Sequence, residues 1–241
     1  MNLQELLEEL RENILRDAST VVSGPADSLF NDASLVRYIN DAEVQFAKQT
    51  LCLRDESTPA VCHVQLVAGQ AEYDLDPRVI ALFGARVVSR HLHRTTYSSM
   101  VQRRGDVSFS SSVESWGRNH SGPELVYSDR EDGRVGVYPA PSQSFIDATG
   151  GLLILRVARK PLNPLVATSL KAEPEVREEY HLDLLEWAAW RALRNNDADV
   201  EALAKASAHK KRFIDATAEL KAQAKRLLMQ EIQFGLSTNW S

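Results

Sequence analysis

The residues with the clearest chemical potential are histidines and cysteines in the first half of the chain. His91 and His93 alternate, so on a strand both imidazoles would lie on one face, as a pair of metal ligands requires. Two ligands are too few for a metal site, and no acidic residue or cysteine lies at a spacing typical of a third or fourth ligand. Cys52 and Cys62, the latter beside His63, lack the C-x-x-C pairs of a zinc site. We therefore expect no metal, with the histidines as ordinary surface residues and the cysteines as small buried hydrophobes.

A second group combines the residue types of acid–base catalysis. His181, Asp183 and Glu186 lie on a predicted helix, where a solvated helix face is the more typical role of such a set. Serine is abundant around residues 108–115, but the sequence contains no G-x-S-x-G, P-loop, G-x-G-x-x-G or H-E-x-x-H motif. The sequence therefore predicts a protein that is not an enzyme and needs no cofactor. A small hydrolase with an unrecognised site stays open as a further hypothesis.

Between residues 205 and 226 the last predicted helix is locally basic, with Asp215 and Glu219 as the opposing charges of that stretch. Its cations are Lys205, Lys210, Lys211, Arg212, Lys221, Lys225 and Arg226. Such a stripe could contact DNA phosphates, or pair with acidic residues of another copy of the chain, such as those of the first helix. Cations toward a helix C-terminus are also favourable with the helix dipole. The sequence leaves these three interpretations open.

The bulk composition is that of an ordinary globular protein. The chain has 241 residues, of which 44% are hydrophobic and 25% charged, enough for a substantial core without a metal or disulfide. Its net charge of -5 argues against a protein whose main task is to grip nucleic acid. Two cysteines suit a reducing compartment. Since we find neither a signal peptide nor an apolar run of about 18 residues, we expect a soluble protein without membrane contact.

The two ends of the chain have helical periodicity. Residues 2–17 predict an amphipathic helix with a capping box between Asn2 and Glu5, and a second helix should run from an N-cap at Asp32 to about residue 53. Helix returns after Glu173-Pro174, because proline suits the first helical position. A long last helix is expected over 198–231, with an apolar stripe that includes Leu203, Ala206, Phe213, Ala216, Leu220, Ala224 and Leu227.

The middle of the chain has the composition of strands and turns. We expect strands at 61–67 and 72–75 joined by a turn at 68–70, a turn at 76–77, and a strand pair at 79–90 and 92–97. Residues 105–124 predict a long exposed loop. Residues 125–127 and 134–138 predict a hairpin around Asp132-Gly133, and residues 152–159 are the clearest strand.

Together these elements predict an α+β fold: a helical bundle from the N- and C-terminal segments, an inserted antiparallel β domain and an extended C-terminal tail. The expected divisions are 1–58 with 172–231 for the bundle, 59–171 for the β domain and 232–241 for the tail. That tail carries Ile232, Phe234, Leu236 and Trp240 and no charge after Glu231, so it should dock on a partner or fold back on its own bundle.

Five segments, in this order along the chain, resemble the head-to-tail adaptor proteins of tailed bacteriophages, of the podovirus type that lies below the portal. They are SLVRYINDA at 34–42, TLCLRD at 50–55, LVAGQAEYDL at 66–75, VYPAP at 137–141 and EYHLDLLEWAA at 179–189. The first is similar to the L-x-x-Y-I-N-x-A helix of that family, the third to its G-Q-x-x-Y hairpin and the fourth to its Y-P-x-P strand end.

The resemblance implies a structural protein of the virion neck, assembled in the bacterial host cytoplasm. It implies a ring, dodecameric in such adaptors, that joins the portal to the tail nozzle or tail fibres and encloses DNA without reading its sequence. Residues 230–241 match by position the segment that reaches into the portal, which makes Ile232, Phe234, Leu236 and Trp240 the expected docking residues. The loop with Trp116 and Arg118 should face the tail, and the free protein could stay monomeric until portal is present. A DNA-binding or packaging accessory that uses the basic last helix is the alternative.

Overall fold

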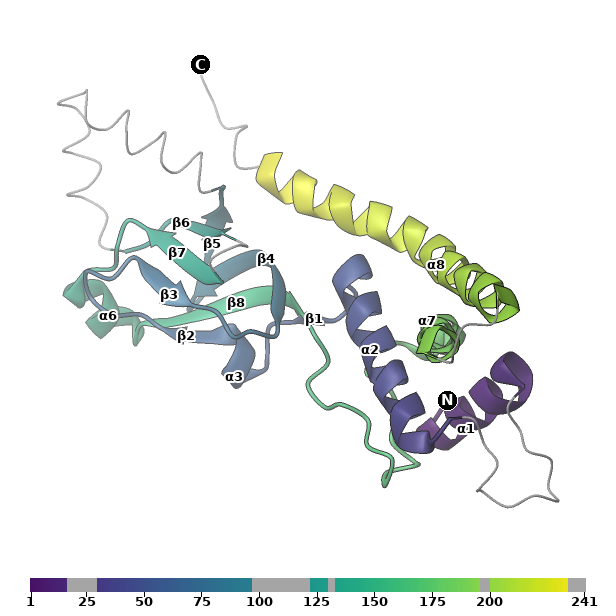
Figure 1. Cartoon of the computed structure of the whole chain (residues 1–241). Coiled ribbons are helices and arrows are strands. Elements are labelled where there is room, and N and C mark those ends of the chain that lie inside the picture. The colour runs from purple at the N-terminus through teal and green to yellow at the C-terminus, as the bar shows by residue number, and fades with distance from the viewer. Residues whose placement is uncertain (17–29, 97–121, 130–132, 196–199, 234–241) are drawn as a thin grey trace. The chain divides into compact units, whose positions relative to one another are not determined.

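The computed structural model describes residues 1–16, 30–96, 122–129, 133–195 and 200–233 (Figure 1). The chain divides into a helical unit, Met1–Leu53 with Lys160–Gln223, and a β unit, Arg54–Arg159 with the chain from Ala224 on. The α+β class is thereby confirmed: helices from both ends of the chain pack together, and the sheet is an insertion between them. The boundaries predicted at 58/59 and 171/172 stay predictions.

Six helical segments lie among the described residues outside Arg54–Arg159. They are α1 (Leu3–Glu9), a π-helical continuation η1 (Leu10–Leu15), α2 (Asp32–Thr50), a 3-10 turn η3 (Glu178–Tyr180), α7 (His181–Asn195) and α8 (Val200–Gln233). Within the helical unit α7 packs against α1 and α2 (Figure 1). Helix α8 also contacts α7, through His209 with Glu186 and through Phe213 with Trp187.

The first helix is fixed at its start by side chain and backbone together. Asn2 accepts a hydrogen bond from the backbone N–H of Glu5, whose carboxylate accepts one from the backbone N–H of Asn2, both at 3.0 Å, which confirms the predicted capping box. Two more free N–H groups of the first turn, those of Leu3 and Gln4, donate to carbonyl oxygens of residues 172 and 170. The N-terminal helix is therefore pinned to the segment that returns from the β unit.

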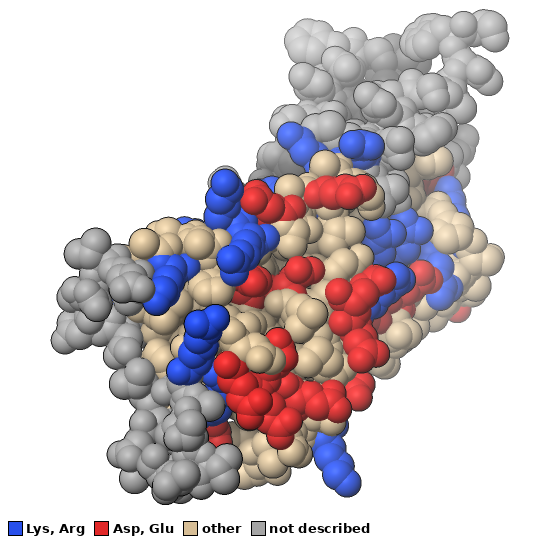
Figure 2. Space-filling model, turned by 90° about the vertical axis from the view of Figure 1, so that its right-hand side faces the viewer, with Lys and Arg blue, Asp and Glu red and all other residues tan. Residues whose placement is uncertain are grey.

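The outer side of α1 is acidic because its leucines all point inward. Leu3, Leu6, Leu7 and Leu10 are buried, whereas Glu5, Glu8 and Glu12 are exposed. We call these three glutamates the acidic face of α1, although Glu12 lies on its continuation η1. On the side of the molecule that holds the N-terminal helix, Figure 2 shows Asp and Glu side chains gathered into a block, with Lys and Arg in separate groups beside it.

Two apolar clusters hold the helical unit, one on each side of α7. The first combines the leucines of α1 with Leu35 and Ile39 of α2 and the small residues Ala188, Ala189 and Ala192 of α7, which let the helices approach closely. The second joins Phe46 of α2 to Leu184 of α7 and Phe213 of α8. Phe46 and Phe213 meet edge to face with ring centroids 6.3 Å apart.

The long helix α8 buries a narrower stripe than its sequence suggests. Ala206, Phe213 and Ala224 are buried as predicted, but Leu203 is 49% exposed. With Thr217 included, the buried side chains recur at intervals of seven, four and seven residues, which is the spacing of a seam between two helices and not of a broad core face. Most of α8 therefore lies at the surface, where its remaining side chains are available for other contacts.

Three predicted helix ends are corrected by backbone hydrogen bonding. The N-cap of α2 is Asn31, which accepts from the N–H of Ser34, so Asp32 is the first helical residue. The same helix ends at Thr50, because Leu51 adopts a left-handed conformation with φ 53°. Helix does not resume at Pro174, since the N–H groups of Glu175 and Val176 donate to the Glu43 carboxylate and these two residues form a bend.

Between Arg54 and Arg159 the β unit contains eight strands and two short helices among its described residues. The strands are β1 (Arg54–Asp55), β2 (His63–Gln65), β3 (Glu72–Asp74), β4 (Val79–Val87), β5 (Arg90–Arg94), β6 (Leu125–Asp129), β7 (Arg134–Tyr138) and β8 (Leu152–Arg159). The helices are α3 (Pro59–Cys62) and α6 (Gln143–Thr149). The strand order is β1-β8-β4-β5-β6-β7-β3, with β2 also paired to β8.

The predicted strand at residues 152–159 is β8, and it organises the sheet. It pairs antiparallel with β4 along one edge and with both β1 and β2 along the other. The predicted pairs β4–β5 and β6–β7 are confirmed as antiparallel ladders. Among the described strands the antiparallel pattern is broken where β5 and β6 run parallel, so the sheet is mixed.

Two local predictions in the β unit are wrong. The segment 61–67 was expected to pair with 72–75, but β2 pairs with β8 and β3 pairs with β7. Residues 61 and 62 belong to the helical turn α3, which begins at Pro59. Helix α6 was not predicted, because its seven residues are too few to show a period. Residues 105–121 of the predicted loop lie outside the described residues.

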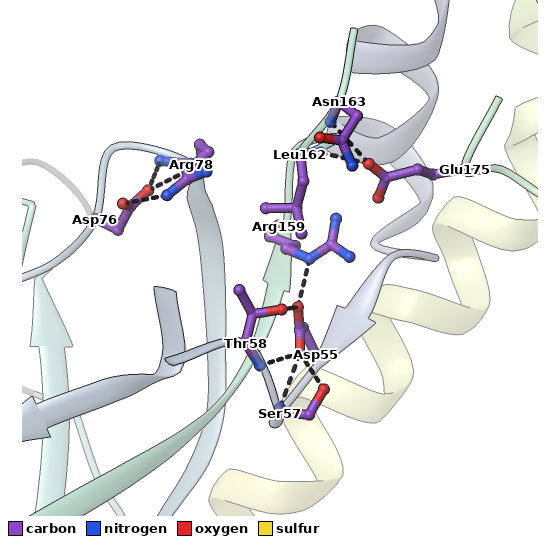
Figure 3. Close-up of polar contacts among 9 residues, drawn as sticks. All are labelled: Asp55, Ser57, Thr58, Asp76, Arg78, Arg159, Leu162, Asn163 and Glu175. Carbon is purple, nitrogen blue, oxygen red and sulfur yellow. Dashed lines mark hydrogen bonds and ion pairs between the residues drawn. The ribbon is translucent and has the colours of Figure 1, made fainter. Parts of the chain in front are cut away.

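The two ends of the β unit are tied together at Asp55. Strand β1 pairs with the end of β8, placing Arg54 opposite Ala158 and Asp55 opposite Val157. The Asp55 carboxylate accepts hydrogen bonds from the backbone N–H and hydroxyl groups of Ser57 and Thr58, and from Arg159 at 2.6 Å (Figure 3). The Asp55 and Arg159 side chains are 5% and 13% exposed. The first and last residues of the insertion are thus joined by strand pairing and by a buried ion pair.

This environment shifts the titration of Asp55. Burial by itself would raise the pKa of Asp55, but the hydrogen bonds from Thr58, Arg159 and the backbone of Ser57 outweigh it and hold the pKa well below its ordinary value. A carboxylate with a depressed pKa stabilises the fold above its unfolded pKa of about 3.9. That contribution is lost as pH falls toward the folded pKa.

We predict that Asp55→Asn lowers the free energy of unfolding by about 3–5 kcal/mol at pH 7, because it removes the carboxylate charge of a buried ion pair with Arg159. The variant should also lose the part of the acid destabilisation of the wild type that begins below about pH 4. Urea denaturation across pH 3–7 measures both effects.

Asp76→Asn is the matched control, since Asp76 also accepts two hydrogen bonds from an arginine side chain, Arg78, but both side chains are less buried than the Asp55–Arg159 pair, at 18% and 37% exposed (Figure 3). It should change stability much less. Equal losses in the two variants would contradict the role assigned to Asp55.

Candidate functional site

One turn of α2 presents polar side chains to the segment that returns from the β unit. Asn40 donates to the carbonyl oxygen of Leu165 at 2.9 Å and accepts from its N–H at 2.8 Å. Glu43, 1% exposed, accepts from the N–H groups of Glu175 and Val176 at 2.6 and 3.2 Å. Asn40 and Glu43 thus pair with the backbone as a neighbouring strand would, and satisfy groups that would otherwise be buried without partners.

Two further carboxylates extend this arrangement. Glu175 itself accepts from the N–H groups of Leu162 and Asn163 at 2.6 and 3.0 Å (Figure 3). Asp41, the residue after Asn40, faces α7: it accepts a hydrogen bond from the indole N–H of Trp187 at 2.8 Å and lies 3.5 Å from Arg191. The motif residues Asn40 and Asp41 therefore hold the fold of the helical unit. The sequence does carry a signal for this structural role, because Asn40 and Asp41 lie directly between the core residues Ile39 and Ala42.

The basic residues of α8 do not form a single face. At about 100° per residue, one side of the helix next to its buried seam carries a row without acidic residues. We call this row the lysine flank; it consists of Leu203, Ser207, Lys210, Ile214, Ala218, Lys221 and Lys225. All seven are exposed, including Leu203 at 49% and Ile214 at 46%. The Lys210 ammonium lies 4.8 Å from the ring centroid of Trp190.

The other predicted cations of α8 lie elsewhere on its circumference. Lys205 and Arg212 project on the opposite side of the buried seam, and Lys211 and Arg226 lie toward the back of the helix. Arg212 is 3.6 Å from Glu186 of α7, which also contacts His209 at 2.6 Å. Arg212 therefore contributes to the joint between α7 and α8, and the lysine flank is the more available part of the predicted basic stripe.

The β unit has an open groove of about 370 Å³ on the face formed by β4, β5 and β8. Its lining includes Arg86, His91, His93 and Arg156, and its charge is partly offset by Glu56, which lies 2.8 Å from Arg86. His91 and His93 are exposed and share one face of β5, as predicted. Within the described residues no group of three His, Cys, Asp or Glu side chains could hold a metal ion.

The candidate acid–base set on α7 does not converge on a common point. His181 is buried, contrary to the expected solvated face, and its Nε2 lies 2.8 Å from the carbonyl oxygen of Val176. Glu186 is engaged by His209. Burial, with the nearby charge of Glu186, raises the pKa of Asp183. These contacts assign His181 and Glu186 to helix packing.

The two cysteines differ in environment. Cys62 is buried as predicted, and burial raises the pKa of its thiol to about 11, which keeps it protonated and unreactive at neutral pH. Cys52 is exposed, so the expectation that it is a buried hydrophobe is wrong. It follows the left-handed Leu51 at the end of α2, where the chain turns outward.

Several predicted docking residues lie beyond what the structure describes. Ile232 falls in the last turn of α8, without a described side chain, and Phe234, Leu236 and Trp240 lie outside the described residues. The same holds for Trp116 and Arg118. Across the described helices, none combines the length and apolar character needed to cross a membrane.

We predict that Glu43→Ala lowers the free energy of unfolding by about 2–4 kcal/mol, because the N–H groups of residues 175 and 176 lose their acceptor. Glu43→Gln, which keeps an acceptor oxygen, should lose less. Urea denaturation gives the energies, and limited proteolysis should show faster cleavage within 160–177. Lys48→Ala, an exposed change on the same helix, is the control, and a Glu43→Ala variant that behaves like it would refute this assignment.

Comparison with known proteins gives one match that spans nearly the whole chain. A family model described as SU10 adaptor protein matches residues 1–232. The curated proteins contain no match to this sequence. The matched range includes both chain segments of the helical unit and the complete inserted sheet.

Proposed function

Because this chain belongs to the SU10 adaptor protein family, a family of phage adaptors, we propose that it is the structural head-to-tail adaptor of a tailed phage. In this proposal its copies form a ring, dodecameric as the sequence resemblance implies, that joins the portal to the tail nozzle or tail fibres. The family match over residues 1–232 is the observation that carries the proposal. In this proposal the protein is located in the neck of the virion, after assembly in the host cytoplasm.

The proposed mechanism is surface complementarity without turnover. An adaptor needs separate surfaces for its neighbours in the ring and for the components above and below. The described residues offer such surfaces in the exposed lysine flank of α8 and the acidic face of α1. The candidate acid–base residues of α7 are engaged in packing, which supports a binding role over a catalytic one.

The contacts above and below the ring are assigned from the sequence. We expect the C-terminal tail, with Ile232, Phe234, Leu236 and Trp240, to dock on the portal, because large apolar side chains without nearby charge gain most from burial in a partner. The loop that contains Trp116 and Arg118 is the expected contact with the tail. DNA would pass through the lumen without sequence-specific binding.

Deletion of residues 232–241 should leave a folded protein that no longer binds portal. Circular dichroism checks the fold, and negative-stain images of portal mixed with each protein check attachment. The full-length variant Ser237→Ala/Thr238→Ala, which changes polar residues of the same tail, should attach normally. Normal attachment of the truncated chain would show that the tail is not the docking segment.

A second candidate, a DNA-binding or packaging accessory, is favoured by the exposed lysines of α8. The two functions differ in their response to salt. If the free protein binds DNA through these lysines, its affinity should fall steeply between 50 and 200 mM salt, by about tenfold or more for several phosphate contacts. An adaptor whose lysines face a protein should show little DNA binding even at low salt. Fluorescence anisotropy with a short duplex, at several salt concentrations, distinguishes them.

A further inference from the structure

The acidic face of α1 and the lysine flank of α8 have opposite charge and the same spacing. Glu8 and Glu12 are four residues apart on the N-terminal helices, and Lys221 and Lys225 are four residues apart on α8. Four residues correspond to about one helical turn, so each pair lines up along one side of its helix. Two crossing helices could therefore form both ion pairs at once.

These charges are not used within the described structure. Glu8 accepts a hydrogen bond from Gln4, and Glu5 completes the capping box. No ion pair to Glu8, Glu12, Lys221 or Lys225 is formed by the described residues, and none joins α1 to α8. The nearest cation of the N-terminal helices, Arg11, is engaged by Asp32. Both surfaces thus keep their charge for a partner.

The charges also restrict the kind of contact that two copies can make. If like surfaces met across a two-fold axis, lysines would face lysines or glutamates would face glutamates, which is repulsive. Contact between the lysine flank of one copy and the acidic face of the next is attractive, and such a head-to-tail contact repeats around a ring when the rotation closes. The exposed Leu203 and Ile214 on the same flank add apolar area that this contact would cover.

We propose that adjacent copies of this protein join through the lysine flank of α8 on one side and the acidic face of α1 on the other, with Lys221 and Lys225 opposite Glu8 and Glu12. This inference rests on the proposed ring-forming function. Exposed ion pairs are individually weak, so the contact favours copies that are already held side by side, for example on the portal.

Charge reversal tests the contact directly. Lys221→Glu/Lys225→Glu and Glu8→Lys/Glu12→Lys should each raise the protein concentration needed for ring assembly on portal particles by about tenfold or more. A mixture of the two variants in equal amounts should restore assembly, because every contact between unlike copies again joins opposite charges. The chain with all four reversals should assemble alone. Assembly is followed by sedimentation velocity of the full-length proteins with portal.

The control is Lys48→Glu/Lys171→Glu, which makes the same change in net charge as Lys221→Glu/Lys225→Glu, at exposed positions outside the two surfaces. It should assemble like the wild type, and thermal unfolding should show that every variant folds. If the reversed variants assemble normally, or their mixture does not recover, the proposed contact is wrong although a ring can still exist. If wild-type protein forms no multimer on portal, the proposed adaptor function fails instead.

Discussion

The structure depends on a constraint set by its insertion: the chain must leave the helical unit after Leu53 and return to it at Lys160. The β unit meets this constraint at its own two ends, where β1 pairs with the last residues of β8 and Asp55 binds Arg159. A buried carboxylate is tolerated here because five hydrogen bonds satisfy it. Strand β8 then organises the rest of the sheet from this fixed end, since it pairs with β4 and β2 as well.

In the helical unit, side chains of α2 hold the segment that returns from the β unit. The returning segment 160–177 has little regular secondary structure, so its backbone needs partners from elsewhere. Asn40 and Glu43 of α2 supply them as side-chain acceptors and donors, and Glu175 supplies others within the segment itself. The segment also caps α1, because its carbonyl groups accept from Leu3 and Gln4. The irregular segment 160–177 thereby hydrogen-bonds to both α1 and α2 and continues directly from the end of β8.

The exposed surfaces suit a protein that assembles late. A long helix with a narrow buried seam leaves most of its side chains in water, and its charges are separated from those of α1 instead of being paired with them. Separated charges keep a free copy soluble in the presence of others and still favour one orientation of contact when copies are brought together. In the adaptor function proposed above, both surfaces would remain available until copies meet during assembly.

The sequence by itself determined the elements whose signal is local. Capping at Asn2 and Glu5, the hairpin of β6 and β7, the span of β8 and the buried faces of α1 and α7 all follow from spacing between near neighbours. Family membership followed from the order of five short segments. Pairings between distant segments could not be predicted this way, because β2 has the same composition whether it pairs with β3 or with β8.

The tertiary structure alone decided which polar residues are structural and which are free. Asn40, Glu43, Asp55 and His181 look like surface residues in the sequence, but each faces a backbone or side-chain partner more than a hundred residues away or in a tight local turn. The basic residues of α8 look like one stripe, but relative to the buried seam they lie on both of its sides and at the back of the helix. Burial is set by what packs against an element, and that information does not lie within the element's own residues.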